Sequence, residues 1–266
     1  MPAVLGIDAA WTANEPSGVA LLVKRSMRWH CLRLAPSYAA FCDNDFSWDA
    51  PVRGGIPDVK QLLGICSALI GNKGNLKVVA VDMPLANRPI IGRRAADDIV
   101  SRQFGARKCA VHSPTIVRPG MVGAELHSNF IRSGFSLDVD NSRPSQALLE
   151  VYPHVALLSL MNATERLPYK ASKTLTYWGK ACAIEERKRR LLVQWADILK
   201  RLRKNVDGIE LPLPSEPGQL SFQHLKRYED AIDALVCAWM ATRYLANDAL
   251  PLGDGSAAIW IPSGLD

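Results

Sequence analysis

The chain has 266 residues, of which 48% are hydrophobic and 22% charged, and its formal net charge is +6. This length supports one domain with a sizeable α/β core, and the positive charge favours partners rich in phosphate. No basic leader precedes an apolar stretch, and no window approaches about 18 uncharged apolar residues, so export and membrane spanning are not expected.

The spacing of the six cysteines predicts reduced thiols in a cytoplasmic protein. No two of them form a CxxC pair or a zinc-type spacing with a histidine, and several lie in apolar segments. They are Cys31, Cys42, Cys66, Cys109, Cys182 and Cys237.

The first part of the sequence predicts an antiparallel start to a sheet. An apolar strand ends at Asp8, and a polar turn separates it from two strands over 18–25 and 27–35, which form a hairpin. An irregular stretch is expected over 35–55. A helix then begins at Asp58, because apolar residues recur at three- and four-residue spacing until a GNKGN segment ends it.

The segment LKVVAVDM, residues 76–83, is continuously apolar and β-branched, as expected of a strand covered on both faces. Pro84 ends this strand, so Asp82 lies at its carboxyl end. Open α/β sheets bind ligands outside the carboxyl ends of their strands, and the position of Asp82 therefore favours a functional role.

Residues 92–146 are predicted to form an insertion before the next strand. Helices are expected over 93–105 and 123–134, with a Pro-containing loop between them. A short strand over 147–152 follows the insertion.

The last part of the chain is predicted to be mostly helical. A short helix is expected over 155–161 and a long one over 180–204, which has one apolar and one polar face. A Pro-rich connector leads to a further helix that carries Asp230 and Asp233. The tail, residues 250–262, is expected to add an edge strand.

Four acidic residues end or adjoin the segments expected to form the core: Asp8, Asp82, Asp230 and Asp233. Two unit charges about 4 Å apart repel by about 4 kcal/mol at an effective dielectric near 20, so such a cluster needs cations or protons. Asp230 and Asp233 lie three residues apart on one helical face and can share a cation. Carboxylates suit Mg²⁺ or Mn²⁺, and two such ions about 3.5 to 4 Å apart are a recurrent apparatus for phosphodiester hydrolysis.

The order of strand, hairpin, helix, acid-bearing strand and late helix with two acids resembles the RNase H-like fold. More closely, six segments resemble domain-of-unknown-function family 429, described as predicted RNase H-like nucleases. They are GIDAAW, VDMPL, RRAADDIVSRQFG, LLEVYPH, SKTLTYWG and YEDAIDALVCAWMATRYL, and the resemblance runs from about Val4 to Ile261. It implies a single α/β domain with a mixed five-stranded sheet of order 3-2-1-4-5, strand 2 antiparallel, flanked by helices. A helical insertion is expected between the fourth and fifth strands.

Holliday-junction resolvases of the RuvC type are similar at the first strand, at the acid-bearing fourth strand and in the late helix. This similarity implies that Asp8, Asp82, Asp230 and Asp233 bind the metal ions and are catalytic. Glu150, in LLEVYPH, resembles the acid of another family element and is expected near the metals as a further catalytic group. The alternative for Glu150 is a charge at a strand edge.

Arg94, Asp97 and Arg102 resemble the family's R-x-x-D element and a later arginine. Arg94 or Lys173 is expected to hold the scissile phosphate through charge-assisted hydrogen bonds, with Arg102 as a further substrate-binding residue. The alternative is an i, i+4 ion pair between Asp98 and Arg102 on a solvated helix.

The aspartates also have purely structural interpretations. Asp8 could accept hydrogen bonds in the turn after the first strand, and Asp82 could cap the turn that follows it. Asp230 and Asp233 could be acids in the first turn of the helix that interact favourably with the helix dipole. The run of Arg and Lys over 187–204 is either a solvated face or a wall for a polyanion, whose affinity would fall steeply with salt.

The leading hypothesis is a nuclease, a metal-dependent phosphodiesterase with two Mg²⁺ or Mn²⁺ ions that acts on nucleic acid, DNA or RNA. A homodimer is left open. One alternative is a non-catalytic nucleic-acid-binding or scaffold protein of the same fold. Another is an actin- or sugar-kinase-type phosphotransferase, whose nucleotide loop needs glycine after the first aspartate, where this chain has Ala9, Ala10 and Trp11.

Overall fold

The computed structural model describes residues 1–265, and its centre is one mixed sheet of nine strands. Eight strands follow the order β7-β3-β2-β1-β4-β6-β9-β8, and β5 pairs with β6 beside this path. The strands are β1 (Pro2–Asp8), β2 (Gly18–Arg25), β3 (Arg28–Ala35), β4 (Asn75–Val81), β5 (Ser136–Leu137), β6 (Ala147–Val151), β7 (Val206–Asp207), β8 (Ala249–Gly253) and β9 (Ala258–Pro262).

Helices connect the strands and cover the sheet. The α-helices are α1 (Tyr38–Cys42), α2 (Val59–Ile70), α3 (Ala95–Phe104), α4 (Gly120–Arg132), α5 (Pro153–Met161), α6 (Thr174–Trp178), α7 (Ile184–Leu202) and α8 (Phe222–Leu245). Two short 3-10 helices, η1 (Ala171–Lys173) and η2 (Pro217–Gln219), precede α6 and α8.

The middle of the sheet joins an antiparallel hairpin to parallel strands. β2 pairs antiparallel with both β1 and β3, whereas β4 pairs parallel with β1 and β6 pairs parallel with β4. The nearly continuous buried runs of β1, β2 and β4 fit this central position, because strands covered on both faces do not alternate with polar residues. As parallel neighbours, β1 and β4 end at the same edge of the sheet.

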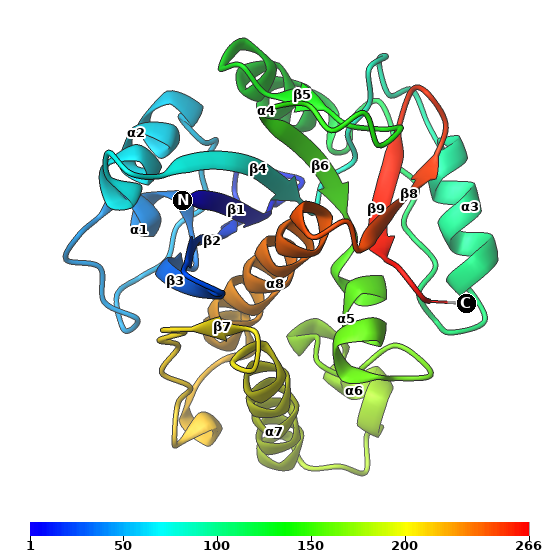
Figure 1. The fold of residues 1–266 in the computed structure, drawn as a ribbon. Coiled ribbons are helices and arrows are strands. Elements are labelled where there is room, and N and C mark those ends of the chain that lie inside the picture. The colour runs from blue at the N-terminus through cyan, green and yellow to red at the C-terminus, as the bar shows by residue number, and fades with distance from the viewer. Residues whose placement is uncertain (266) are drawn as a thin grey trace.

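Two groups of helices cover the two faces of the sheet. α8 crosses the middle of the molecule, and α5 and α7 lie on the same side (Figure 1). Their apolar side chains form one core with alternate strand residues such as Val4 and Val78. The intervening residues, such as Leu5 and Val79, form a second core with α1, α2 and α4. The sheet therefore separates two apolar layers, and α8 belongs to only one of them.

α8 packs closely on β1 and β2 because glycines remove side chains from the contact. A Cβ on Gly6 would lie 2.2 Å from the carbonyl oxygen of Ala234, and one on Gly18 would lie 2.0 Å from that of Asp230. Neither contact is possible for a larger residue unless the backbone moves. The two glycines therefore set the distance between α8 and the sheet, and with it the position of the acids on α8.

The structure differs from the sequence-based expectation in several segments. The stretch 35–55, expected to be irregular, contains α1, and α6 was not expected at all. The tail forms a hairpin instead of one edge strand, so that β9 pairs parallel with β6 inside the sheet and β8 forms the edge. Asp254 makes this hairpin possible, because its carboxylate accepts the amides of Ser256 and Ala257 in the turn.

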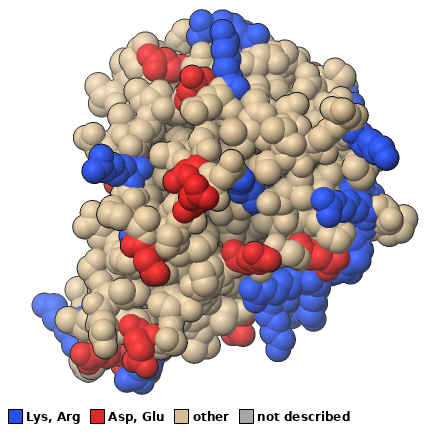
Figure 2. Space-filling view, turned by 90° about the vertical axis from the view of Figure 1, so that its left-hand side faces the viewer, with Lys and Arg blue, Asp and Glu red and all other residues tan. Residues whose placement is uncertain are grey.

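On the surface that carries α1 and α2, most of the area is uncharged and acidic side chains form small groups, whereas basic side chains gather at the top and along the lower right (Figure 2). Among residues 1–265, no helix combines the length and the apolar character that crossing a membrane requires.

Candidate active site

Asp8 and Asp82 stand at the carboxyl ends of the neighbouring strands β1 and β4. The Asp82 amide donates to the carbonyl oxygen of Ile7 at 2.9 Å, which ties the two strand ends together. Both aspartates are partly exposed and line one cavity of about 440 Å³. The turn after β1 is closed without Asp8, because the Ala10 amide donates to Ser17 Oγ at 3.0 Å. Two segments that are far apart in the sequence therefore present their acids to the same space.

α8 brings Asp230 and Asp233 to this edge of the sheet. Ser221 caps the helix by accepting the amide of His224 at 3.0 Å, so the two aspartates lie in its third and fourth turns. Both are completely buried. The interpretation of these residues as first-turn acids is therefore wrong, and the helix dipole does not explain them.

Burial and mutual repulsion oppose the ionisation of these carboxyl groups. Burial raises the pKa of Asp8 from 3.8 to about 6, and the charge of Asp233 adds to the increase. Burial also raises the pKa of Asp82 well above its usual value, with the charge of Asp8 as the next cause. For Asp230, burial raises the pKa against the opposing charge of Lys226. The cluster therefore contains more acid than the neighbouring cations compensate.

Two lysines provide partial compensation. Lys170 Nζ contacts Asp233 and lies 3.3 Å from Glu229 Oε1, while Lys226 Nζ pairs with Asp230. Although burial opposes it, the charge of Asp233 holds the pKa of Lys170 well above its usual value. The Lys170 side chain is 18% exposed and that of Lys226 is 41% exposed, so solvent weakens the Lys226 pair more.

One fully buried carboxylate oxygen in the cluster is left without a partner among residues 1–265. Asp230 Oδ1 accepts from Lys226, but the buried Oδ2 has no hydrogen-bond partner among the described residues. An unsatisfied buried acceptor costs about 1–3 kcal/mol, and more when it is charged. Nevertheless, within residues 1–265 no group of three His, Cys, Asp or Glu side chains is placed to hold a metal ion. The acids have the chemistry of cation ligands but are not arranged as a complete ligand set.

Lys170 belongs to a connecting segment, residues 162–173, which we call the basic loop. Tyr169 in this loop donates its hydroxyl to Asp233 Oδ1 at 2.8 Å, and a backbone amide of the loop donates to Glu229 Oε2. These contacts dock the loop on α8. The position of Lys170 therefore depends on the same acids whose charge it compensates.

A further acid, Glu150 on β6, is completely paired. Arg94 Nη1 and Nη2 donate to its two carboxylate oxygens at 2.6 Å each, and the Leu85 amide donates to Oε2 at 2.7 Å. Arg94 also pairs with Asp97 at 2.6 Å, and all three charged side chains are buried. We call Arg94, Asp97 and Glu150 the clamp.

The clamp occupies Arg94 fully. Its five N–H donors are all used, by Glu150, by Asp97 and by the carbonyl oxygen of Leu85. While the clamp is intact, Arg94 therefore has no donor left for the scissile phosphate that it was expected to hold. Glu150 is close enough to Asp82 to raise its pKa, but its own oxygens are engaged.

The two other predicted substrate-binding residues lie in different surroundings. Lys173 is exposed at the end of η1 and lines a cavity of about 290 Å³ that Asp82 also lines. Arg102 is exposed in the last turn of α3 and lines neither cavity at the acids. The alternative pairing of Asp98 with Arg102 is wrong, because Asp98 pairs with Arg93 at 2.5 Å.

A family profile described as "Protein of unknown function (DUF429)" matches residues 6–256. The chain belongs to the DUF429 family. The matched region contains Asp8, Asp82, the clamp, the basic loop and both aspartates of α8. No curated protein and no solved structure matches the chain. Because the family description names no activity, a function for this DUF429 protein has to be argued from the site itself.

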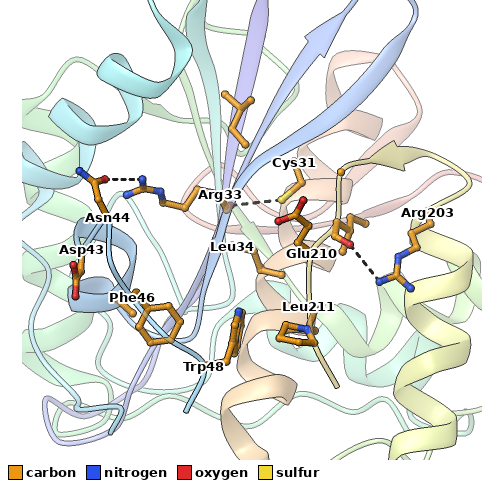
Figure 3. A pocket seen from close by; sticks show the side chains of 15 residues that line it. Cys31, Arg33, Leu34, Asp43, Asn44, Phe46, Trp48, Arg203, Glu210 and Leu211 are labelled. Atoms are coloured by element: carbon orange, nitrogen blue, oxygen red, sulfur yellow. Dashed lines mark hydrogen bonds between the residues drawn. The ribbon is translucent and has the colours of Figure 1, made fainter. Parts of the chain in front are cut away.

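A larger cavity of the DUF429 protein, about 680 Å³, lies beside β3 and is less suited to chemistry. Figure 3 shows Arg33 turned towards Asn44, to whose side chain it donates at 2.7 Å. Arg203 likewise donates to the carbonyl oxygen of Ile209 at 3.2 Å. The cationic groups here are satisfied by their neighbours, and the acids in the lining do not form a cluster.

The basic helix α7 packs against α8, but several of its cations are engaged elsewhere. Arg189 and Arg190 pair with Glu186, while Lys188 is buried and donates to the carbonyl oxygen of Gly218 at 2.9 Å. None of these residues lines either cavity at Asp82. Several cations of this helix therefore serve its own pairing and packing.

Sequence reasoning missed three charged residues of the site, and two of them gave a signal. Lys226 with Asp230, and Glu229 with Asp233, are each four residues apart, a spacing that places them together on a helix. Lys170 gave no such signal, because Asp233 lies 63 residues further along the chain.

Proposed function

We propose that this DUF429 protein is a divalent-metal-dependent phosphodiester hydrolase, a nuclease with an RNase H-like fold. The observation that carries the proposal is the convergence of Asp8, Asp82, Asp230 and Asp233 at one sheet edge, with Asp230 Oδ2 unpartnered. Clustered acids with strongly raised pKa values beside a cavity are typical of functional sites.

The strand order supports the fold part of this proposal. The series β3-β2-β1-β4-β6, with β2 antiparallel, has the order expected of an RNase H-like sheet if β6 is counted as its fifth strand. The helices α3 and α4 then form the insertion between the fourth and fifth strands. Because one fold hosts many activities, the activity itself is argued from the acids alone.

The acids fit Mg²⁺ or Mn²⁺ in their chemistry, because these hard cations prefer carboxylate oxygens. Asp8, Asp82 and the free Oδ2 of Asp230 would hold one ion, and Asp8 with Asp233 would hold a second. The second position requires Lys170 to leave Asp233, whereas the first does not. When bound, such ions lower the pKa of a water molecule and stabilise charge on the leaving oxygen.

The remaining charged groups prepare the site for a polyanion. Lys226 is the more exposed of the two lysines and can leave Asp230 at a lower cost than Lys170 can leave its buried partners. Lys173 and Arg118 are exposed at the two cavities and attract a phosphate backbone towards the acids. These residues make nucleic acid the proposed substrate.

A cytoplasmic location is part of the same proposal. All six cysteines are free, and Cys66, Cys109 and Cys237 are buried. Unpaired thiols are typical of proteins in reducing compartments.

Calorimetric titration with MnCl₂ and cleavage assays on labelled DNA and RNA test the proposal. The wild type is expected to bind Mn²⁺ and to cleave at least one substrate. Asp8→Asn and Asp82→Asn should weaken both by roughly two orders of magnitude, because each removes a charged ligand. Asp98→Asn, which changes an exposed acid outside the site, should match the wild type. Absence of Mn²⁺ binding, or full cleavage by Asp8→Asn, would disprove the proposal.

A non-catalytic nucleic-acid-binding protein of the same fold is the second candidate. It is favoured by the two lysines, which already neutralise Asp230 and Asp233 in part, and by the incomplete ligand set. Such a protein would bind nucleic acid with an affinity that falls steeply with salt. Its affinity would be the same in the wild type and in Asp82→Asn, and no substrate would be cleaved.

A further inference from the structure

Asp82 also lines the cavity of about 290 Å³, whose wall carries five cationic and four acidic residues. The cationic residues of the lining are Arg94, Arg166, Lys170, Lys173 and Lys226. Arg94, Lys170 and Lys226 are each ion-paired with acids. Arg166 and Lys173 have no acidic partner within residues 1–265. The cavity therefore holds two uncompensated positive charges beside an aspartate of the proposed active site.

Arg166 is held in place by its backbone, but its side chain is unused. Its amide donates to the carbonyl oxygen of Arg107 at 2.9 Å. Its side-chain Nε is buried and has no hydrogen-bond partner among the described residues. Arg107 differs, because its guanidinium donates to the carbonyl oxygens of Ala163 and Thr164. A buried guanidinium donor without an acceptor is costly, so Arg166 lacks a partner that the chain itself does not supply.

Two neighbours extend the same wall. Lys173 ends η1 and keeps its ammonium group exposed. His154 is buried, and its Nδ1 has no hydrogen-bond partner within residues 1–265. The basic loop carries both Arg166 and Lys173, and its docking on α8 fixes the two cations relative to each other.

We propose that Arg166 and Lys173 form an anion subsite that binds a phosphate group of nucleic acid beside Asp82. A planar guanidinium suits two phosphate oxygens at once, and an ammonium group adds a point charge at the open side. Positive charge here also reduces the repulsion between a phosphate and the acidic cluster. The role of these two residues as a substrate subsite rests on the proposed hydrolase function. Their binding of phosphate does not depend on that function.

Calorimetric titration of inorganic phosphate into the full chain, with EDTA present and ionic strength held constant by NaCl, tests the subsite without metal. The wild type should bind phosphate, and Arg166→Gln should weaken binding about tenfold or more. Lys173→Gln should weaken it about threefold, because this side chain is exposed. Arg102→Gln changes an exposed arginine outside the cavity and should keep the wild-type Kd. Should Arg166→Gln fail to fold, Lys173→Gln still decides.

No phosphate binding by the wild type, or the same Kd in the wild type and both subsite variants, would overturn the inference. Oligonucleotides with and without a 5′-phosphate then separate two sources of the anion. For a chain-end phosphate, the 5′-phosphate tightens binding and Arg166→Gln removes the gain. For an internal phosphate, both oligonucleotides bind alike and both weaken in Arg166→Gln. If the wild type binds phosphate as expected but cleaves no substrate with Mn²⁺, the result counts against the hydrolase proposal alone.

Discussion

Two groups of acids adjoin the cavity that Asp82, Asp97 and Glu150 line, and their charges are compensated in opposite ways. In the clamp, one guanidinium meets Glu150 and Asp97 with paired, short hydrogen bonds. At the ends of β1 and β4, two ammonium groups face a larger number of carboxylates, and Asp230 Oδ2 remains without a partner. Complete pairing is what a structural charge requires, whereas incomplete pairing leaves a place for something that the chain does not contain.

The electrostatics of the two groups follow this difference. Although burial opposes it, the charges of Glu150 and Asp97 hold the pKa of Arg94 above its usual value. In the acidic cluster, by contrast, burial raises the pKa of Asp8 to about 6. Burial raises the pKa of Glu150 as well, but the charge and the hydrogen bonds of Arg94 oppose this increase. Breaking the clamp should therefore destabilise the fold, whereas the less compensated acidic cluster should reduce its stability.

The largest expected effect comes from breaking the clamp. Arg94→Met leaves Glu150 and Asp97 buried without a cation and should lower the free energy of unfolding by about 3–5 kcal/mol, measured by urea denaturation. Arg93→Met is the matched control, since Arg93 is exposed and its pair with Asp98 is worth about 1 kcal/mol or less. Equal losses in the two variants would contradict the structural role of the clamp.

A smaller loss is expected from Lys170→Met. Asp233 and Glu229 then lose their cation but keep hydrogen bonds from the basic loop, so the free energy of unfolding should fall by about 2–3 kcal/mol. Lys226→Met, at the more exposed pair, should cost less than about 1 kcal/mol. The same urea denaturation compares the two variants. A larger loss of unfolding free energy in Lys226→Met would contradict the proposal that Lys226 leaves its acid at a lower cost than Lys170 does.

A substitution at Asp8 should increase the free energy of unfolding instead of lowering it. Asp8→Asn removes a charge that burial and neighbouring acids oppose, so in metal-free buffer at pH 7 it should raise the free energy of unfolding by about 1–2 kcal/mol. The equivalent change in the clamp, Glu150→Gln, should lower it, because Arg94 loses its charged partner. Destabilisation by both variants would mean that the two groups of acids do not differ in role.

The last expected effect is a dependence of stability on pH. Between pH 3.8 and about 6, Asp8 is protonated in the folded state and ionised in the unfolded state, so the folded state binds more protons. Stability from this group should therefore fall as pH rises through that window and level off above it. Urea midpoints measured from pH 4 to 7 should show a shallower decline in Asp8→Asn. An unchanged slope would contradict the raised pKa.

Much of the sheet could be predicted because its signals are local. The apolar runs before Asp8 and Asp82 and the capped helix after Asp58 indicate their elements directly. The place of β9 could not be read in this way, because its pairing with β6 joins residues about a hundred positions apart, such as Glu150 and Ile259. The short helix α1 was missed because its apolar segment is too brief to show a period.

The candidate site was predicted in part for the same reason. The four aspartates could be named because acids beside core segments are conspicuous in the sequence. The surroundings of the nearby cations could not be predicted, since Lys170 and Arg166 lie in a loop without periodic structure, and Arg94 reaches Glu150 across 56 residues. The functions of Arg94 and Lys173 looked alike in the sequence, and only the surrounding acids distinguish them.

The close contact of α8 with Gly6 and Gly18 has a consequence for the order of biosynthesis. The first and second strands leave the ribosome more than 190 residues before α8 does, as residues 2–25 and 222–245 show. Until α8 arrives, Asp8 faces solvent or a chaperone instead of Asp230 and Asp233. A polypeptide without α8 therefore lacks the assembled acids, and any reactivity of this centre requires α8 to have been synthesised.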